Sequence, residues 1–118
     1  MSYPASMSQA GPVKITTPQE IRPLVDALLL RFHPEAIWLF GSRARGDNRD
    51  DSDWDLLMVL PDDCPSELLD PLHAWEVRSR IGVPATVISA LSGELTESAG
   101  APNTLAYEVA RDGKLLVD

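Results

Sequence analysis

The sequence predicts an α/β (α+β) fold, a small mixed β-sheet flanked by helices, and three observations support this. Two short apolar runs, 36–40 and 56–60, have the length of buried strands, and the second is apolar at every position. Segments 17–32 and 66–80 carry apolar residues at helical spacing. The chain of 118 residues has room for one domain with a hydrophobic core and none for a second.

The first expected element is a helix that begins near Thr17. The run Thr17-Pro18-Gln19-Glu20 resembles a capping box, with Thr17 as N-cap and Glu20 reaching back to it. Pro23 would remove a backbone hydrogen bond from the helix interior, at a cost of about 3 kcal/mol. The helix therefore either kinks there or begins late. We expect it to end at His33, on the protein surface.

The C-terminal half is expected to alternate helices and strands after a strand over 54–60. Pro71 interrupts the helical pattern of 66–80, which leaves one kinked helix or two short helices open, and Gly82 suits a C-cap. The remaining expected elements are a strand over 83–89, a loop with room for a helical turn over 90–102, a helix from Asn103 through Arg111, and a closing strand over 114–117.

Composition sets the expected domain boundaries and compartment. Residues 1–15 are rich in Ser, Pro, Ala and Gly without a period, which predicts a mobile tail, and the folded domain is expected over 16–118. The single cysteine, Cys64, excludes an internal disulfide and favours a reducing compartment. No apolar run approaches the roughly 20 residues of a membrane span, and no signal pattern is present, so we expect a cytoplasmic protein without membrane contact.

The net charge indicates which classes of ligand the protein is expected to bind. The chain has 18 acidic and 10 basic residues, a net charge of -8, and this balance disfavours general affinity for nucleic acid. The three arginines of the loop after the first strand still provide a local basic patch that suits a single nucleotide. These are Arg43, Arg45 and Arg49.

Asp53 and Asp55 are the strongest candidates for a functional site. Alternate residues of a strand share a face, so these two carboxylates are expected to lie a few ångströms apart. They repel each other unless a cation lies between them. Oxygen ligands suit a hard ion, Mg²⁺ first and Mn²⁺ second. The structural alternative is a solvated pair that caps the start of the strand.

Gly41-Ser42 supplies the complementary half of such a site. Glycine lets the backbone approach a ligand closely, and free N–H groups after a strand, together with a serine hydroxyl, form a phosphate cradle. Arg43 and Arg45 add positive charge beside it, although an ion pair of Arg45 with Asp53 or Asp55 is an equal alternative. A phosphate cradle facing a carboxylate pair is what phosphoryl or nucleotidyl transfer requires.

The motif itself resembles a known signature. Gly41-Ser42, ten residues and then Asp53-Trp54-Asp55 is similar to the pattern of the DNA polymerase β-type nucleotidyltransferase superfamily. The sequence GSRARG followed by SDWDLL resembles that of its minimal nucleotidyltransferase branch, and the similarity extends over about residues 16–116. The resemblance implies the nucleotidyltransferase fold.

The resemblance also implies roles for these residues. Asp53 and Asp55 would be catalytic and hold Mg²⁺, Ser42 would contact the nucleotide phosphates, and Gly41 would allow their approach. Arg43 and Arg45 would stabilise phosphate or the leaving group. Members of the superfamily typically carry a third carboxylate on the neighbouring strand, and that position falls on Thr86 here, or on Ala85 if the register slips by one. A threonine hydroxyl is a weak Mg²⁺ ligand and no base near neutral pH.

Two functions therefore follow from the resemblance. The first is an Mg²⁺-dependent enzyme that moves a nucleoside monophosphate from an NTP, ATP first, to an acceptor hydroxyl. In minimal members the partner is a HEPN-type toxin, which the nucleotidyltransferase neutralises as an antitoxin, in some cases by adenylylating it. The second is an antitoxin or adaptor that binds nucleotide or partner without turnover, because Thr86 replaces the carboxylate. Another acid, such as Glu76, Glu94 or Asp51, could also take that place.

Overall fold

The computed structural model of this protein describes residues 13–98, 100–101 and 104–118. Its centre is a four-stranded sheet in the order β3-β2-β1-β4. β1 is antiparallel to both of its neighbours, and β2 is parallel to β3, so the sheet is mixed. The strands are β1 (Ala36–Phe40), β2 (Trp54–Leu60), β3 (Ala85–Leu91) and β4 (Lys114–Val117). The predicted fold class is confirmed.

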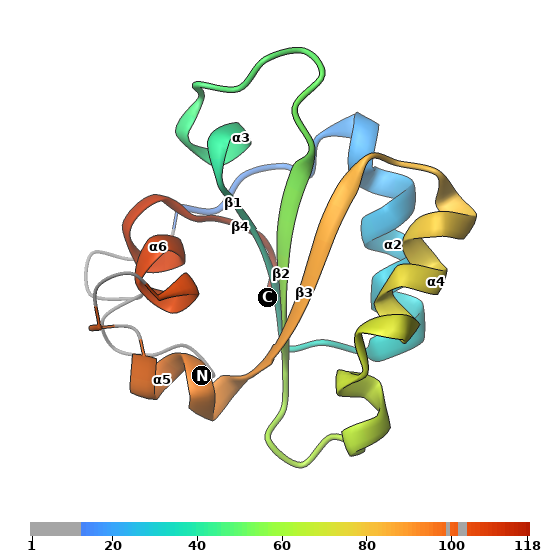
Figure 1. Ribbon diagram of the computed structural model, residues 1–118, viewed down its shortest axis with the longest axis vertical. Helices are drawn as coiled ribbons and strands as arrows, with labels where there is room; N and C mark the ends of the chain where they lie inside the picture. Colours follow the sequence, from blue (N-terminus) through green and yellow to red (C-terminus); the bar gives the residue numbers. More distant parts are fainter. Residues whose placement is uncertain (1–12, 99, 102–103) are drawn as a thin grey trace.

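Helices cover both faces of the sheet (Figure 1). One face packs against α2 (Arg22–Phe32) and α4 (Pro71–Ile81), and the other against α5 (Ser92–Ser98) and α6 (Leu105–Asp112). The two central strands alternate their side chains between these layers, so every residue of the first strand is buried. Towards α2 and α4 lie Ile37, Leu39, Leu56 and Met58; towards α5 and α6 lie Trp38, Phe40, Leu57 and Val59.

The first helix begins later than its capping signal predicts. A 3-10 turn, η1 (Gln19–Ile21), precedes α2, and neither N-terminus has a side-chain capping hydrogen bond. The predicted capping box at Thr17 is therefore wrong. Pro23 instead lies in the first turn of α2, where its missing N–H needs no partner, so the helix starts late and does not kink. His33 ends the helix in the left-handed conformation (φ 49°) and is exposed.

Pro71 divides the second helical segment in two. A 3-10 turn, η2 (Ser66–Leu69), is followed by α4, in which Pro71 is the first residue. The Asp70 carboxylate accepts a hydrogen bond from the Leu72 N–H at 3.0 Å and caps α4. Gly82 ends α4 in the left-handed conformation, as predicted.

Two predicted boundaries near the C-terminus shift. The strand expected over 83–89 runs over Ala85–Leu91, and α5 replaces most of the loop expected after it. The Asp62 carboxylate accepts from the Gly93 N–H at 2.8 Å and so caps α5 from outside the helix, which the local sequence does not reveal. The predicted cap Asn103 lies outside the described residues, and Thr104 caps α6 by accepting from Tyr107.

The N-terminal segment that is described lies along the outer edge of β4. Leu115 donates its N–H to the Val13 carbonyl (2.8 Å) and accepts from the Ile15 N–H (3.0 Å). Residues 13–15, expected in the mobile tail, are thus hydrogen-bonded to the sheet, and residues 1–12 lie outside the described part. In that described part, none of the helices has the length and apolar character to cross a membrane.

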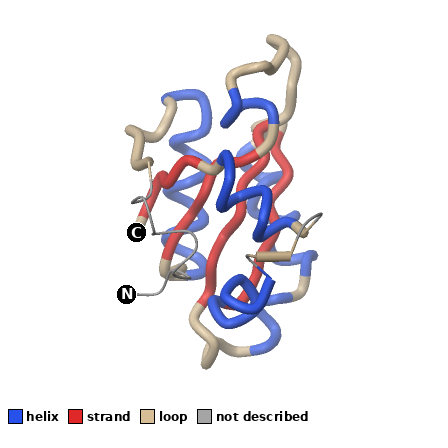
Figure 2. The backbone as a smooth tube through the Cα atoms, turned by 90° about the vertical axis from the view of Figure 1, so that its left-hand side faces the viewer, coloured by secondary structure: helices blue, strands red, loops and turns tan. Residues whose placement is uncertain are grey.

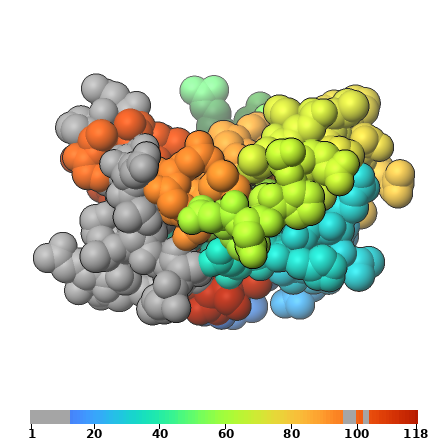
Figure 3. All heavy atoms as spheres, turned by 90° about the horizontal axis from the view of Figure 1, so that it is seen from below, coloured from blue at the N-terminus to red at the C-terminus, as the bar shows by residue number. Residues whose placement is uncertain are grey.

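The end of β1 and the start of β2 meet at one end of the sheet, joined through α3 (Ser42–Arg45) and a loop over 46–53 (Figures 1 and 2). The opposite end is formed by residues 61–70, packed between α5 and the end of α2 (Figure 3). The predicted site residues therefore gather at the end of the sheet that carries α3.

Candidate functional site

Gly41 and Asp55 are in direct contact at this end of the sheet. Gly41 has φ 74° and ψ −158°, a conformation that is essentially restricted to glycine. A Cβ atom at this residue would overlap Oδ2 of Asp55 and lie 3.1 Å from its Cγ. Any side chain at Gly41 would therefore displace the carboxylate. The glycine of the motif is required by the aspartate as well as by the turn.

Asp55 lies on β2, between the neighbouring strands β1 and β3. Its Cα is paired with that of Phe40 on β1 and with that of Thr86 on β3. The side chain points to the face covered by α5 and α6, and Asp53 precedes it by two residues at the exposed start of the strand. Burial raises the pKa of Asp55 most, the charges of Asp53 and Glu108 raise it further, and Arg45 opposes them. The site thus concentrates negative charge.

Glu108 is the residue that sequence reasoning missed. It lies on α6, and its carboxylate raises the pKa of Asp55 and accepts from Arg45 (Nη1–Oε1 3.5 Å). No motif marks it, because it belongs to the exposed side of an ordinary amphipathic helix. Only the packing of α6 on the sheet brings it to the site.

Arg45 does not pair with the two aspartates of the motif. Its Nε donates to Oδ2 of Asp47 at 3.1 Å, and its second partner is Glu108. The predicted alternative of an ion pair with Asp53 or Asp55 is therefore wrong for this residue. Both contacts are partly exposed, so Arg45 keeps access to solvent and to an anion near the site.

Arg43 holds the loop between β1 and β2. Its guanidinium lies 4.2 Å from the ring centroid of Trp54 and donates to the carbonyls of Ser52 (2.9 and 3.2 Å) and Asp50 (3.2 Å). The Arg49 N–H donates to the Ser52 hydroxyl at 2.8 Å and tightens the same turn. These contacts fix the segment that leads into Asp53.

Thr86, where the family resemblance leads us to expect a third carboxylate, pairs with Asp55 in the parallel register of β2 and β3. It is exposed, like Asp53. Within the described residues, no group of three or more His, Cys, Asp or Glu side chains is arranged to hold a metal ion. Glu94, one of the expected substitutes, accepts from the Leu91 N–H (3.1 Å) at the opposite end of β3.

The donor set of Asp53 and Asp55 fits Mg²⁺. Magnesium in proteins is commonly held by one or two carboxylates, with substrate phosphates and water as its other ligands. The close approach of Gly41 leaves the Asp55 carboxylate beside the start of α3, where the N–H groups of Ala44 and Arg45 donate to the Gly41 carbonyl and those of Ser42 and Arg43 precede the first turn. Two carboxylates and a turn that suits phosphate are thus brought together, as the sequence predicts.

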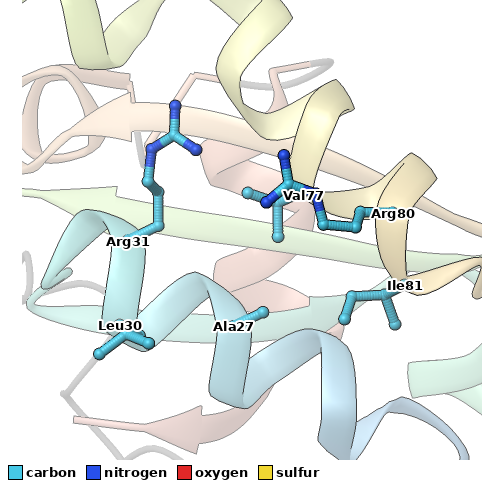
Figure 4. A pocket seen from close by; sticks show the side chains of 6 residues that line it. All are labelled: Ala27, Leu30, Arg31, Val77, Arg80 and Ile81. Carbon is cyan, nitrogen blue, oxygen red and sulfur yellow. The ribbon is translucent and has the colours of Figure 1, made fainter.

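A separate hollow of about 300 Å³ lies between α2 and α4 (Figure 4). Its floor is apolar, and Arg31 of α2 and Arg80 of α4 project beside it. Arg31 donates to Nδ1 of His73 at 2.9 Å. This hollow shares no residue with the predicted site.

Comparison with known proteins shows which family this chain belongs to. The family described as "Polymerase beta, Nucleotidyltransferase" matches residues 24–118. A search of curated proteins finds no match. A solved toxin-antitoxin structure with AMP-PNP shares the fold, with a TM-score of 0.52 and 21% identity over 83% of this chain and 72% of that chain.

A proposed nucleotidyltransferase from Sulfolobus solfataricus aligns with a TM-score of 0.53 and 27% identity, over 81% of this chain and 80% of that chain. The family match covers the whole sheet and every predicted site residue. This chain belongs to the polymerase β-type nucleotidyltransferase family.

Proposed function

We propose that this protein is an Mg²⁺-dependent nucleotidyltransferase that moves a nucleoside monophosphate from an NTP, with ATP as the first candidate, to an acceptor hydroxyl. The observation that carries the proposal is the contact of Gly41 with Asp55. It holds one carboxylate of a pair beside the turn that suits phosphate. Such an arrangement stabilises negative charge as it develops on a transferring phosphoryl group.

Asp53 and Asp55 would hold Mg²⁺, which supplies charge neutralisation to the phosphates and lowers the pKa of a bound hydroxyl. Ser42 and the N–H groups at the start of α3 would bind the phosphates. Arg45 would stabilise the negative charge of the leaving pyrophosphate, because its guanidinium is partly exposed at the site. Arg43 would position the loop and contribute its charge.

The proposed transfer of the nucleoside monophosphate needs only the NTP and the acceptor hydroxyl as reactants. The acceptor oxygen forms a bond to the α-phosphorus, the bond from that phosphorus to the bridging oxygen breaks, and pyrophosphate leaves. The proton of the hydroxyl passes to water, because Thr86 offers no carboxylate at the neighbouring strand. We expect transfer to be slow for this reason.

A protein acceptor and an antitoxin role are the favoured context. The toxin-antitoxin relative with AMP-PNP supports both an adenine nucleotide and a toxin as partner. A HEPN-type ribonuclease is the partner that the resemblance implies, and a net charge of -8 complements a protein that binds nucleic acid. A cytoplasmic location completes this proposal.

The second candidate function is an antitoxin that binds nucleotide or partner without turnover. The observation that favours it is the alignment of Thr86 with Asp55, because this position lacks the third carboxylate. Direct measurement of transfer separates the two functions. A protein that binds Mg²⁺ and ATP, but releases no pyrophosphate with its partner present, is the non-catalytic form.

The first experiment is a thermal-shift titration of ATP with Mg²⁺. Ligand at a hundredfold excess over Kd adds about 2.7 kcal/mol of stability, a readily measured shift. We expect the wild type to shift, and the shift to vanish in Asp53→Asn/Asp55→Asn and in the presence of EDTA. A wild type that shows no shift with any NTP contradicts the proposed nucleotide site.

A further inference from the structure

The outer edge of β3 is unpaired. β3 is the terminal strand of the sheet and pairs only with β2 among the described residues. In Figure 1 the ribbon of β3 runs at the front of the molecule between α4 and α5, and no other described helix or strand is drawn in front of it. The opposite edge differs, because Lys14 and its neighbours lie along β4. Within the part of the chain that the structure describes, one sheet edge is therefore paired with a further segment and the other is open.

The register identifies the free backbone groups. The Trp54 N–H donates to the Pro84 carbonyl at 3.0 Å, so the ladder with β2 uses the even-numbered residues of this strand. The odd-numbered residues then direct their N–H and C=O groups outward. These are Ala85, Val87, Ser89 and Leu91, of which Leu91 already donates its N–H to Glu94.

The sequence of this edge lacks the features that prevent strand pairing. Natural edge strands are usually short or carry Lys, Pro or a bulge. β3 has seven residues, reads ATVISAL, and contains no charge, proline or glycine. Its register with β2 is unbroken. Such an edge accepts a further strand through backbone hydrogen bonds.

A hollow of about 390 Å³ follows the same edge and reaches the candidate site. Asp53 and Thr86 line one part of it, and Trp75 and Arg78 of α4 line another. Trp75 is 53% exposed. Arg78 has no ion pair with any described residue. The hollow therefore offers an aromatic surface and a free cation beside a predicted metal ligand.

We propose that the edge of β3 binds an extended polypeptide segment as an added strand, and that this segment is the acceptor of the transfer reaction. The segment pairs with the outward groups of β3, places an apolar and an acidic side chain against Trp75 and Arg78, and presents a hydroxyl beside Asp53. The transfer step rests on the proposed function, whereas strand addition does not require it.

Two observations favour a partner segment over a second copy of this chain. The net charge of -8 makes identical copies repel each other. Asp53 also lines the hollow, so a segment bound there lies beside a predicted metal ligand, where an acceptor must lie. Backbone pairing supplies affinity, while the Trp75 and Arg78 side chains select the segment.

The test selects peptides of about nine residues, longer than β3, from a random displayed library on the full-length protein. Selected peptides are synthesised and their affinity is measured by fluorescence anisotropy. Val87→Pro removes one outward N–H, and Trp75→Ala removes the aromatic surface. Each is expected to weaken binding about tenfold or more.

Matched controls separate this effect from general damage. Val87→Thr keeps the N–H and nearly the same shape, and Leu72→Ala removes a side chain that is 55% exposed on the same helix but outside the hollow. Both are expected to stay within about twofold of wild type. The inference is overturned if no peptide binds, if binding ignores both test variants, or if the wild type is a dimer that Val87→Pro dissociates.

Failure of strand addition at β3 can be told apart from failure of the proposed nucleotidyl transfer. Selected peptides with a hydroxyl are expected to gain the mass of a nucleoside monophosphate when incubated with Mg²⁺ and ATP. If peptides bind β3 but the wild type shows no ATP shift, the transfer function fails and strand addition stands. If ATP binds and no peptide does, the acceptor inference alone fails.

Discussion

The carboxylate of Asp55 occupies the space in which a side chain at Gly41 would begin. Gly41 directly follows β1 and Asp55 lies on β2, and the antiparallel pairing of these strands places Phe40 opposite Asp55. The glycine of the motif and its second aspartate are therefore one structural unit, and removing either changes the environment of the other.

Gly41→Ala should destabilise the fold by about 3 kcal/mol or more, because a strained backbone conformation alone costs about 1 to 3 kcal/mol and the overlap with Asp55 adds to it. Urea unfolding measures the cost. Gly46→Ala is the control, since Gly46 also has positive φ but nothing within 4 Å of the added Cβ, and about 1 kcal/mol is expected there. Equal costs for the two variants would contradict the steric argument, and Asp55→Ala should partly rescue Gly41→Ala.

Asp55→Asn should stabilise the protein at neutral pH. The pKa of Asp55 is higher in the folded state than in the unfolded chain, so ionisation of this carboxyl costs stability above its folded pKa. The gain from Asn should fade as the pH falls through the folded pKa towards the unfolded value. Solvent screening keeps it below about 1 kcal/mol. Unfolding of both proteins across pH 3–7 tests it, and a gain that grows at low pH would have the wrong sign.

The neighbours of Asp55 should shift its pKa in opposite directions. Glu108→Gln removes a negative charge and should lower the pKa of Asp55, whereas Arg45→Gln removes the opposing positive charge and should raise it. NMR titration of the Asp55 carboxyl measures both. Loss of the exposed Arg45–Glu108 ion pair should cost less than about 1 kcal/mol in either variant. Shifts of the same sign would exclude the proposed charge arrangement.

Thr86→Asp should increase affinity for Mn²⁺ and Mg²⁺ and raise the rate of transfer. A third carboxylate would then lie on β3 beside Asp55, where the register already places Thr86. Calorimetric titration of Mn²⁺ and pyrophosphate release are the measurements. Thr86→Asn, which lacks the charge, serves as control. The added charge should also lower stability in the absence of metal, and a variant with unchanged metal affinity would argue against this register at the site.

Arg43→Lys should loosen the loop that leads into Asp53. Lysine keeps the charge but loses the planar contact with Trp54 and the paired donors to Ser52, at a cost of about 1 to 2 kcal/mol. Amide exchange should be faster at Arg49, whose N–H is bound within the same loop. Arg49→Lys, on an exposed residue, should stay within about 0.5 kcal/mol of wild type. Unchanged exchange in Arg43→Lys would contradict the role of Arg43.

Sequence patterns are most informative where structure depends on near neighbours. The bounds of β1, β2 and β4 agree with the prediction because apolar runs and turn residues are local signals. Pro71 likewise marks a local boundary, although its sequence left open whether the helical segment would kink or divide, and the segment divides. Local signals mislead at Thr17, where a capping pattern was present but Pro23 fits the first turn of a helix that begins later.

The sequence by itself determined the fold class, the family, and the pairing of Gly41-Ser42 with Asp53 and Asp55. Those residues lie in one continuous segment, so a strand, a turn and a strand are enough to bring them together. Only the tertiary structure decided that Glu108 and Arg45 meet beside Asp55 and that no other described segment pairs with the outer edge of β3. These relationships depend on how helices pack on the sheet and on the order of its strands, which no local pattern encodes.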